Sequence, residues 1–430
     1  MAKINHIIVI MMENHSFDNY FGTYPGANGL PNNVCLPISK GSNQCVHPYH
    51  FNSTTLSGDL CHDWNCAHIA YDKGKMDGFV YADKGSALSM GYFDYRQIPY
   101  YWDYASQFVL LDNYFSSLMG PTTPNRMYLL AGQSGGITSD VNLLPNRSAY
   151  TFYFKFIGDE LNTKGITWKY YSGFPDFFNG FNPLPAFSEF KTNASMWKHL
   201  AYDRQFFIDI AQGNLPHVAF VTPQSDQCSE HPPYDVTCGQ NFVVRVVNAV
   251  MQSRYWNSSA IFVTWDEYGG FYDHVPPPQV DKFGYGFRVP LLIISPYARQ
   301  GFIDHKVADH TSILKFIETI FSLPPLTQRD ASASNLMEAF DFSQPPRPPL
   351  VLPGPYIPNH YPLTLANATA SHFTTTAGQS STNTALTSPP GLLNIDRRLL
   401  ILLMVVLGLL FTIIYLKRVK TTHQGRRLLS

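Results

Sequence analysis

The chain is 430 residues long, and 45 % of its residues are hydrophobic, which is enough for one large α/β domain with a sizeable core. Charged residues make up only 14 %, and the formal net charge is −1. A nearly neutral chain lacks the basic excess of nucleic-acid-binding proteins, so we expect no nucleic acid as a partner.

Short apolar runs alternate with helical patterns over residues 1–345, which we expect to form one catalytic domain. The amphipathic pattern at Thr311–Phe321 predicts a helix that Asp309 or Thr311 can cap. Such alternation predicts an α/β fold with a mostly parallel central sheet and helices on both faces. The predicted strands are Ile7–Met12, Phe108–Leu111, Ile166–Tyr171, His217–Val221, Ala260–Trp265 and Val289–Ile294.

Polar side chains follow the predicted strands where ligands bind in such sheets. Glu13 and Asn14 come directly after the first strand, and Asp266 and Glu267 after the fifth. The carboxyl ends of parallel strands share one edge of the sheet, which is the usual ligand-binding edge. Taken alone, each cluster is more often a loop cap than a ligand set. Together, the carboxylates and the amide oxygen predict a site for one or more divalent metal ions.

Thr122 follows the second predicted strand, within the stretch 120–126. Pro124 is typical of the first turn of a helix, so Thr122 is expected beside a helix amino end. The partial positive charge there stabilises an alkoxide and binds phosphate, and a bound metal would activate the hydroxyl further. Arg126 is within reach of the same anion. The alternative is that Thr122 is only a helix cap.

Six cysteines form three local pairs, which predict three disulfide-closed loops and an oxidising compartment. Reduced thiols and a zinc site are the alternatives, although none of the spacings is the usual CxxC. The pairs are Cys35 with Cys45, Cys61 with Cys66, and Cys228 with Cys238.

Histidines beside carboxylates add candidate site residues. His62 and Asp63 lie within one cysteine loop, and Glu230 and His231 within another. A rigid histidine beside a carboxylate can bind phosphoryl oxygens or protonate a leaving alcohol. A lone histidine is usually structural, which is the alternative for each of them, including the late His310.

The C-terminal part of the chain has a different composition. Residues 346–398 are rich first in proline and then in Ser, Thr, Ala and Asn, which predicts a flexible stalk. Residues 399–416 form an uncharged apolar run long enough for a transmembrane helix. The basic tail 417–430 is then expected in the cytoplasm and the catalytic domain outside, at the cell membrane. Ile7–Met12 is too short for a signal peptide, so the route of export stays open.

At these residues the sequence resembles a known family. The run from Glu13 to Gly22 is similar to the opening signature of the microbial phosphoesterase family, which contains acid phosphatases and non-haemolytic phospholipases C. The later blocks occur in that family's order over about residues 4–330. They are His62-Asp63, Gly120 to Arg126, Ser229 to Pro232, Asp266 to Pro276 with His274, and Asp309 to Ser312.

The resemblance implies an alkaline-phosphatase-like fold and a covalent phospho-enzyme. It implies a metal held by Glu13, Asn14, Thr122, Asp266 and Glu267. Thr122 rather than its neighbour is implied by a T-x-P-N pattern. The implied catalytic residues are Thr122, His62, Asp63 and His231, and the implied substrate-binding residues are Arg126, Glu230, His274 and His310.

These residues predict metal-dependent hydrolysis of phosphate esters, either of a small molecule or of a phospholipid. No lipid-binding C-terminal module resembles that of some bacterial phospholipases, which favours an acid phosphatase over a phospholipase C. A non-catalytic envelope protein has no need for the complete ligand set. A sulfatase would need Cys or Ser where Thr122 stands.

Overall fold

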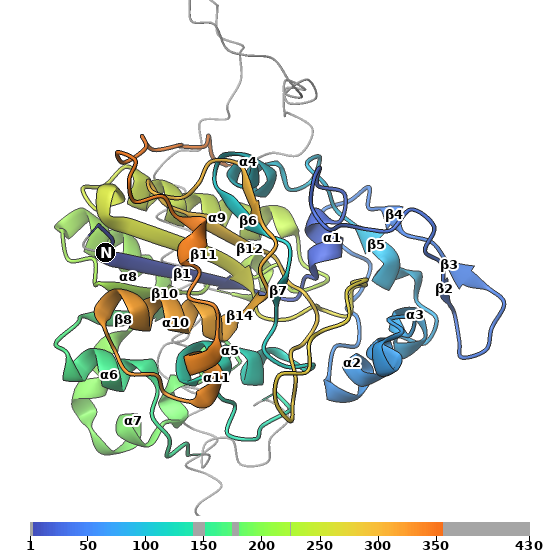
Figure 1. Cartoon of the computed structure of the whole chain (residues 1–430), viewed down its shortest axis with the longest axis horizontal. Helices are drawn as coiled ribbons and strands as arrows, with labels where there is room; N and C mark the ends of the chain where they lie inside the picture. The colour runs from blue at the N-terminus through green and yellow to red at the C-terminus, as the bar shows by residue number, and fades with distance from the viewer. Residues whose placement is uncertain (1–2, 141–150, 174–179, 224, 356–430) are drawn as a thin grey trace, which may run out of the picture. The chain divides into compact units, whose positions relative to one another are not determined.

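The computed structural model describes residues 3–140, 151–173, 180–223 and 225–355, and every structural statement below concerns these residues. The chain divides into two compact units, Met1–Leu363 and Thr364–Ser430, and the second lies outside the described residues. The first unit is built around an eight-stranded sheet (Figure 1). In spatial order its strands are β13 (Phe302–Asp304), β6 (Val109–Leu111), β12 (Leu291–Ile294), β11 (Ser259–Trp265), β1 (His6–Met12), β10 (Val218–Val221), β8 (Trp168–Ser172) and β9 (Leu200–Tyr202).

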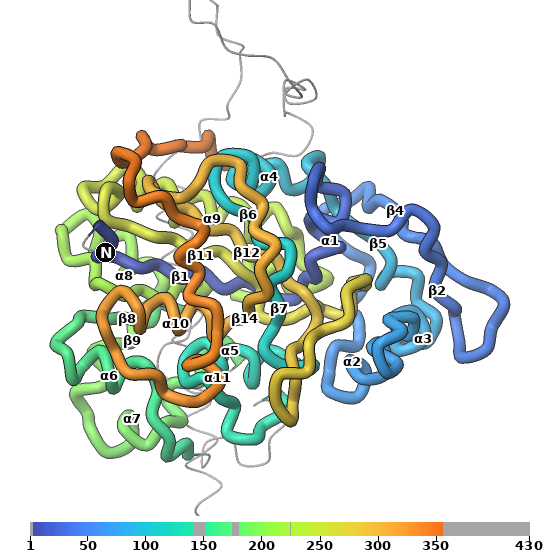
Figure 2. The backbone as a smooth tube through the Cα atoms, in the orientation of Figure 1, coloured from blue at the N-terminus to red at the C-terminus, as the bar shows by residue number. Residues whose placement is uncertain are grey.

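The sheet confirms the six predicted strands and the mostly parallel arrangement. β1 pairs in parallel with β10 and β11, β8 with β10 and β9, and β6 with β13. Only β12 is antiparallel to its neighbours, β11 and β6. The apolar run that predicted β12 does not indicate the direction of the strand. A strand that is buried on both faces is apolar throughout, whether it runs parallel or antiparallel to its neighbours. The seven remaining strands end at one edge, where Figure 2 shows β1 running towards α1 (Phe17–Phe21).

Helices cover both faces of the sheet, as predicted. On β11, Phe262 packs against Phe316 of α10 and Trp265 against Tyr101 of α4, with ring centroids 5.0 and 5.1 Å apart. Residues three apart on a strand point to opposite faces, so α4 and α10 lie in different layers. One layer holds α4 (Pro99–Gln107), α8 (Asp203–Gln212) and α9 (Val236–Met251), and the other α5 (Thr122–Ala131), α6 (Ile157–Thr163), α10 (His310–Phe321) and α11 (Gln328–Ser332).

Small elements surround this core. Asp309 is the N-cap of α10, which decides between the two caps considered for that helix. The short helices α1 to α3 lie beyond the carboxyl end of β1 in Figure 1. The remaining elements are α2 (Trp64–Tyr71), α3 (Phe79–Ala82), α7 (Ser188–Thr192), β2 (Leu36–Pro37), β3 (Cys45–Val46), β4 (Tyr49–His50), β5 (Gly91–Tyr92), β7 (Tyr114–Phe115) and β14 (Ala308–Asp309).

The three predicted disulfides are present, because the cysteines of each local pair are bonded to each other. No cysteine of the chain is left free. The bond between Cys61 and Cys66 closes a short loop around His62, and that between Cys228 and Cys238 closes the loop of His231. Both loops therefore have little freedom to move their histidines.

The predicted boundary at residue 345 needs a correction. Residues 346–355, assigned to the stalk from their prolines, pack on the catalytic domain. The Trp256 indole donates to the Arg347 carbonyl (2.9 Å), and Asn248 exchanges two hydrogen bonds with the Leu352 backbone. Proline removes a donor but leaves a carbonyl acceptor, so a proline-rich segment can still dock.

The predicted membrane span 399–416, the rest of the stalk and the basic tail 417–430 lie outside the described residues. In the part of the chain that the structure describes, no helix combines the length and the apolar character needed to cross a membrane.

Candidate active site

Residues that follow β1, β11 and β7 meet in one buried cluster at the carboxyl edge of the sheet. The Arg126 guanidinium donates from Nη2 to Glu13 Oε1 (2.7 Å) and from Nε to Asp266 Oδ2 (3.2 Å). The Asn14 backbone N–H donates to Asp266 Oδ1 (3.2 Å). Arg126, predicted to bind the substrate anion, thus holds two carboxylates together, because a buried guanidinium needs nearby negative charge.

Three buried polar atoms of this cluster have no hydrogen-bond partner in the described residues. They are Asn14 Oδ1, Glu267 Oε1 and Arg126 Nη1. Burial, and next the charge of Asp266, raise the pKa of Glu13 and of Glu267 well above the usual range of a carboxyl group. An unpaired oxygen in an electronegative cluster is costly unless a cation balances it. The residues present therefore fit a hard divalent cation held by oxygen ligands.

Thr122 is the first residue of α5, and Pro121 is its N-cap. The neighbouring Thr123 is fully engaged, since its N–H and its hydroxyl both donate to Asp140 Oδ1 (2.9 and 3.0 Å). The Thr122 hydroxyl makes no hydrogen bond to any residue that the structure describes. Two adjacent threonines are thus distinguished by their contacts, and Thr122 is the one whose hydroxyl has no partner in the described residues, at the positive end of the helix.

His62 and His231 lie together beside the cluster, with ring centroids 5.4 Å apart. The Leu60 carbonyl lies 2.6 Å from His62 Nδ1 and can only accept, so this nitrogen carries the proton. Nε2 of neutral His62 then accepts from the Asn14 amide (3.2 Å). The carbonyl of Pro232 holds Nδ1 of His231 in the same way (2.6 Å). Both rings are thus oriented by a backbone carbonyl at Nδ1.

A cavity of about 270 Å³ opens next to His62. Its lining includes His62, Asp63, Trp64, Pro121 and Asp140. The Asp63 side chain is exposed and caps α2 by accepting from the Cys66 N–H (2.8 Å). Its contact with the helix is therefore structural, while its position at the cavity leaves it available to a ligand.

His310 is fully buried behind the cluster. Its Nε2 lies 2.8 Å from the Asp266 carbonyl and its Nδ1 2.9 Å from the Tyr114 hydroxyl. Burial lowers the pKa of His310. Both ring nitrogens of His310 contact other protein groups, so His310 positions the backbone of Asp266. The predicted role of His310 in substrate binding is therefore not supported.

His274 belongs to a second charged cluster. Its Nδ1 lies 2.7 Å from Asp18 Oδ2, and the fully buried Arg288 donates to Asp18 (3.0 Å) and to Asp273 (2.8 Å). These contacts tie the segment after Asn14 to the segment after Glu267. His274, predicted to bind substrate, is thus engaged in holding two site loops together.

The comparisons with known proteins agree with this geometry. Residues 4–324 match the model of the Phosphoesterase family. The chain belongs to the Phosphoesterase family.

Curated relatives of this phosphoesterase are phospholipases C. It is 30 % identical to the non-hemolytic phospholipase C of Pseudomonas aeruginosa, over 81 % of this chain and 59 % of that protein. It is also 30 % identical to phospholipase C B of Mycobacterium tuberculosis, over 81 % and 80 % of the two chains. Non-specific phospholipase C1 of Arabidopsis thaliana is 30 % identical, over 80 % and 72 %. These relatives support a phosphoric ester hydrolase.

Solved structures of the alkaline phosphatase superfamily are more distant from this phosphoesterase. A Vibrio parahaemolyticus member gives a TM-score of 0.41 at 10 % identity, covering 78 % of this chain and 70 % of that one. The phosphonate monoester hydrolase of Agrobacterium radiobacter gives 0.39 at 10 % identity, covering 75 % and 74 %.

Three residues that build the site of this phosphoesterase were not predicted from the sequence. Asp140 engages Thr123, and Arg288 joins two site loops. Asn125 accepts from the N–H groups of Ser117 and Leu118 (2.8 and 3.0 Å) and so shapes the turn before α5. Asn125 stands inside a block already singled out, whereas Asp140 and Arg288 follow no periodic or motif signal.

Gly269→Ala is expected to disrupt the cluster. Gly269 has φ +65°, and an added Cβ would lie 2.1 Å from the Asn14 carbonyl oxygen, so the two ligand loops would be forced apart. We expect the free energy of unfolding to fall by at least about 3 kcal/mol in chemical denaturation, together with loss of activity. Gly165→Ala is the matched control, since Gly165 has φ +68° in open space and should cost only about 1–2 kcal/mol. Equal losses in both variants would contradict this role for Gly269.

Glu230 lies behind His231, and its carboxylate accepts from Tyr20 and the Trp265 indole (both 2.8 Å). It does not face the cluster, contrary to its predicted role in substrate binding. Burial raises the pKa of Glu230 from 4.5 to about 8. The folded protein therefore keeps a proton that the unfolded chain releases above pH 4.5.

The free energy of unfolding should consequently fall as the pH rises from about 4.5 to 8. Within this range we expect a loss of about 1.4 kcal/mol for each pH unit. In Glu230→Gln, which cannot ionise, this part of the fall is expected to disappear. Urea unfolding of both proteins at about pH 5, 6.5 and 8 measures the difference. Parallel pH profiles would show that Glu230 does not titrate abnormally.

Proposed function

We propose that this phosphoesterase hydrolyses phosphate esters in two displacements with Thr122 as the nucleophile. The observation that carries the proposal is the Thr122 hydroxyl, without a described protein partner, at the positive end of α5, one turn before Arg126, which binds the buried carboxylates Glu13 and Asp266. A divalent cation held by Glu13, Asn14, Asp266, Glu267 and the Thr122 oxygen would supply the charge that activates the hydroxyl and offsets the phosphate.

In the first displacement the Thr122 oxygen attacks phosphorus in line, and the bond to the alcohol breaks on the opposite side. Thr122 releases its hydroxyl proton to solvent water. His231 or His62, protonated at Nε2, gives that Nε2 proton to the leaving alcohol, because Nδ1 of each ring is held by a backbone carbonyl. Water then attacks the phospho-threonine, which releases the phosphate product and restores the hydroxyl. Positioning and charge neutralisation account for most of the catalysis in such transfers.

We propose a phospholipid as the substrate, because the curated relatives are named phospholipases C. The chain spans only 59 % of the length of the Pseudomonas relative. That this protein acts on the same class of substrate as its relatives is therefore part of the proposal. The acid phosphatase activity expected from the sequence stays a prediction that the same assay tests.

The assay compares phosphatidylcholine with a chromogenic phosphomonoester across pH, using the full chain in detergent, with and without a chelator. Hydrolysis of the lipid that a chelator abolishes and added divalent metal restores is the expected result. Hydrolysis of the monoester alone would make the protein a phosphatase. Folded, metal-supplied protein that is inactive on both would contradict the proposed function and favour a non-catalytic envelope protein.

We further propose that residues 399–416 anchor the protein in the cell membrane with the catalytic domain outside. Three disulfides agree with an oxidising compartment. The full chain is expected to stay with the membrane after alkaline carbonate extraction, and external protease should reach the domain in intact cells. Release by carbonate, or protection from protease, would contradict this topology.

A further inference from the structure

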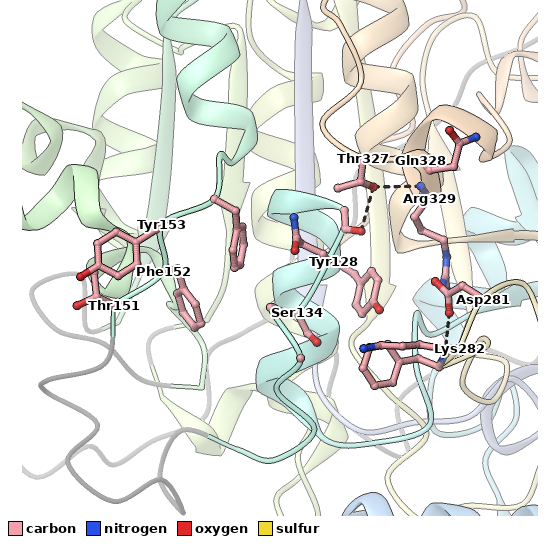
Figure 3. A pocket seen from close by; sticks show the side chains of 16 residues that line it. Tyr128, Ser134, Thr151, Phe152, Tyr153, Asp281, Lys282, Thr327, Gln328 and Arg329 are labelled. Carbon is pink, nitrogen blue, oxygen red and sulfur yellow. Dashed lines mark hydrogen bonds and ion pairs between the residues drawn. The ribbon is translucent and has the colours of Figure 1, made fainter.

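A second and larger cavity lies at the far end of α5. Its volume is about 880 Å³, within the roughly 300–1,000 Å³ of typical small-molecule sites. Figure 3 shows the side chains that line it, and five of them are aromatic. These are Tyr128, Phe152, Tyr153, Phe154 and Phe283. These five rings form a wall that can pack against an apolar group, while the other lining residues are glycines or polar and charged side chains, among them Lys282 and Arg329.

This cavity adjoins the catalytic site through shared elements. α5 begins at Thr122 and carries Tyr128 into the large cavity, and its ten residues span about 15 Å. The segment that follows α5 lines the large cavity at 132–136 and the smaller cavity beside His62 at 138–140. Phe283 of the large cavity meets Trp64 of the small one edge to face, with ring centroids 6.1 Å apart. A ligand held at Thr122 can therefore enter the large cavity only with an extended group.

The large cavity also offers a polar group without a partner. Ser134 is 1 % exposed, and its hydroxyl has no hydrogen-bond partner in the described residues. Arg329 Nε, on another wall of the cavity, is likewise buried and unpaired, although the rest of its guanidinium binds Asp281, Ser117 and Gly284. Buried donors of this kind are costly unless a ligand satisfies them. An acyl ester provides both an apolar chain and a carbonyl acceptor.

We propose that the 880 Å³ cavity binds an acyl ester chain of the lipid whose phosphate lies at Thr122. The inference rests on the proposed phospholipid substrate and extends it, since the cavity would select lipids by the length of their chains. Each methylene that enters the cavity should tighten binding about fourfold, which corresponds to about 0.8 kcal/mol of apolar burial.

Equilibrium binding tests the proposal without turnover. Dibutanoyl, dihexanoyl and diheptanoyl phosphatidylcholine, each kept below its micellar concentration, are titrated into the full-length Thr122→Ala protein by calorimetry. We expect Kd to fall steeply along this series. Adding Tyr153→Asp places a charge at the rim of the cavity, where the side chain is 82 % exposed and folding is not at risk. This change should weaken binding of the longest lipid at least about tenfold and flatten the series.

Tyr95→Asp is the matched control, because Tyr95 is also exposed (38 %) and does not line the cavity. It should leave the series steep. A flat series in the parent, or a steep one that Tyr153→Asp does not change, would overturn the acyl site. Lipid hydrolysis by wild-type protein with a flat series would leave the proposed function standing, whereas a steep series without any hydrolysis would support the acyl site alone.

Discussion

Thr122→Ala is expected to lower kcat/KM on every hydrolysed phosphate ester by at least about 10⁴-fold, as loss of a nucleophile does in other covalent enzymes. The Thr122 hydroxyl has no described protein partner, so its removal should leave the fold and its melting temperature almost unchanged. Steady-state kinetics with circular dichroism of the same samples measures both. Acid-quenched wild-type protein should also yield a peptide phosphorylated at Thr122.

Two variants make this result specific. Thr122→Ser keeps the hydroxyl and is expected to retain activity within about tenfold. Thr123→Ala removes the adjacent hydroxyl, which is bonded to Asp140, and should cost about 1 kcal/mol of stability with most of the activity kept. The opposite pattern, with Thr123→Ala inactive and Thr122→Ala active, would reassign the nucleophile to Thr123.

Asp266→Asn is expected to remove both metal binding and activity. Asp266 contacts Arg126 and the Asn14 backbone, and its charge acts directly on Glu13 and Glu267. A neutral amide is a much weaker ligand for a hard cation. We expect turnover to fall at least about 10³-fold. Divalent metal at 100 times its Kd should stabilise wild-type protein by about 2.7 kcal/mol, and this stabilisation should vanish in the variant.

Elemental analysis of the purified proteins and thermal melts with and without metal provide the readouts apart from activity. Glu338→Gln is the control. Glu338 is an exposed carboxylate that pairs with Lys306 and makes no ion pair with Glu13, Asp266 or Glu267. Such a surface pair contributes little, so this variant should bind metal and melt as wild type does. If Asp266→Asn retains full metal content, Asp266 is not a ligand.

The residues at the strand ends were predictable because each apolar run in the sequence is followed directly by polar residues. Buried strands read as apolar runs, and polar residues that interrupt them at the same end must meet when the strands are parallel. Glu13, Asn14, Asp266 and Glu267 follow this rule, and the structure brings them together. The local cysteine pairs were predictable for a similar reason, since close pairs in one loop can bond without help from the rest of the fold.

Roles that depend on where a side chain points were not predictable. Arg126, Glu230, His274 and His310 stand in family blocks, yet each is engaged with other protein groups. A residue's place in a motif predicts where its backbone lies relative to the site, but not the direction in which its side chain points. The choice between facing a substrate and facing a carboxylate or carbonyl depends on partners far away in sequence, such as Asp266 for His310.

The fold class, the edge of the sheet that carries the site and the three disulfides could be predicted from the amino-acid sequence alone. These features follow from local periodicity and short spacings. Three features follow only from the packing of the folded chain: β12 runs antiparallel, Asp140 binds Thr123 rather than Thr122, and residues 346–355 belong to the domain. Each of them depends on contacts between separate segments of the chain, which local sequence patterns do not contain.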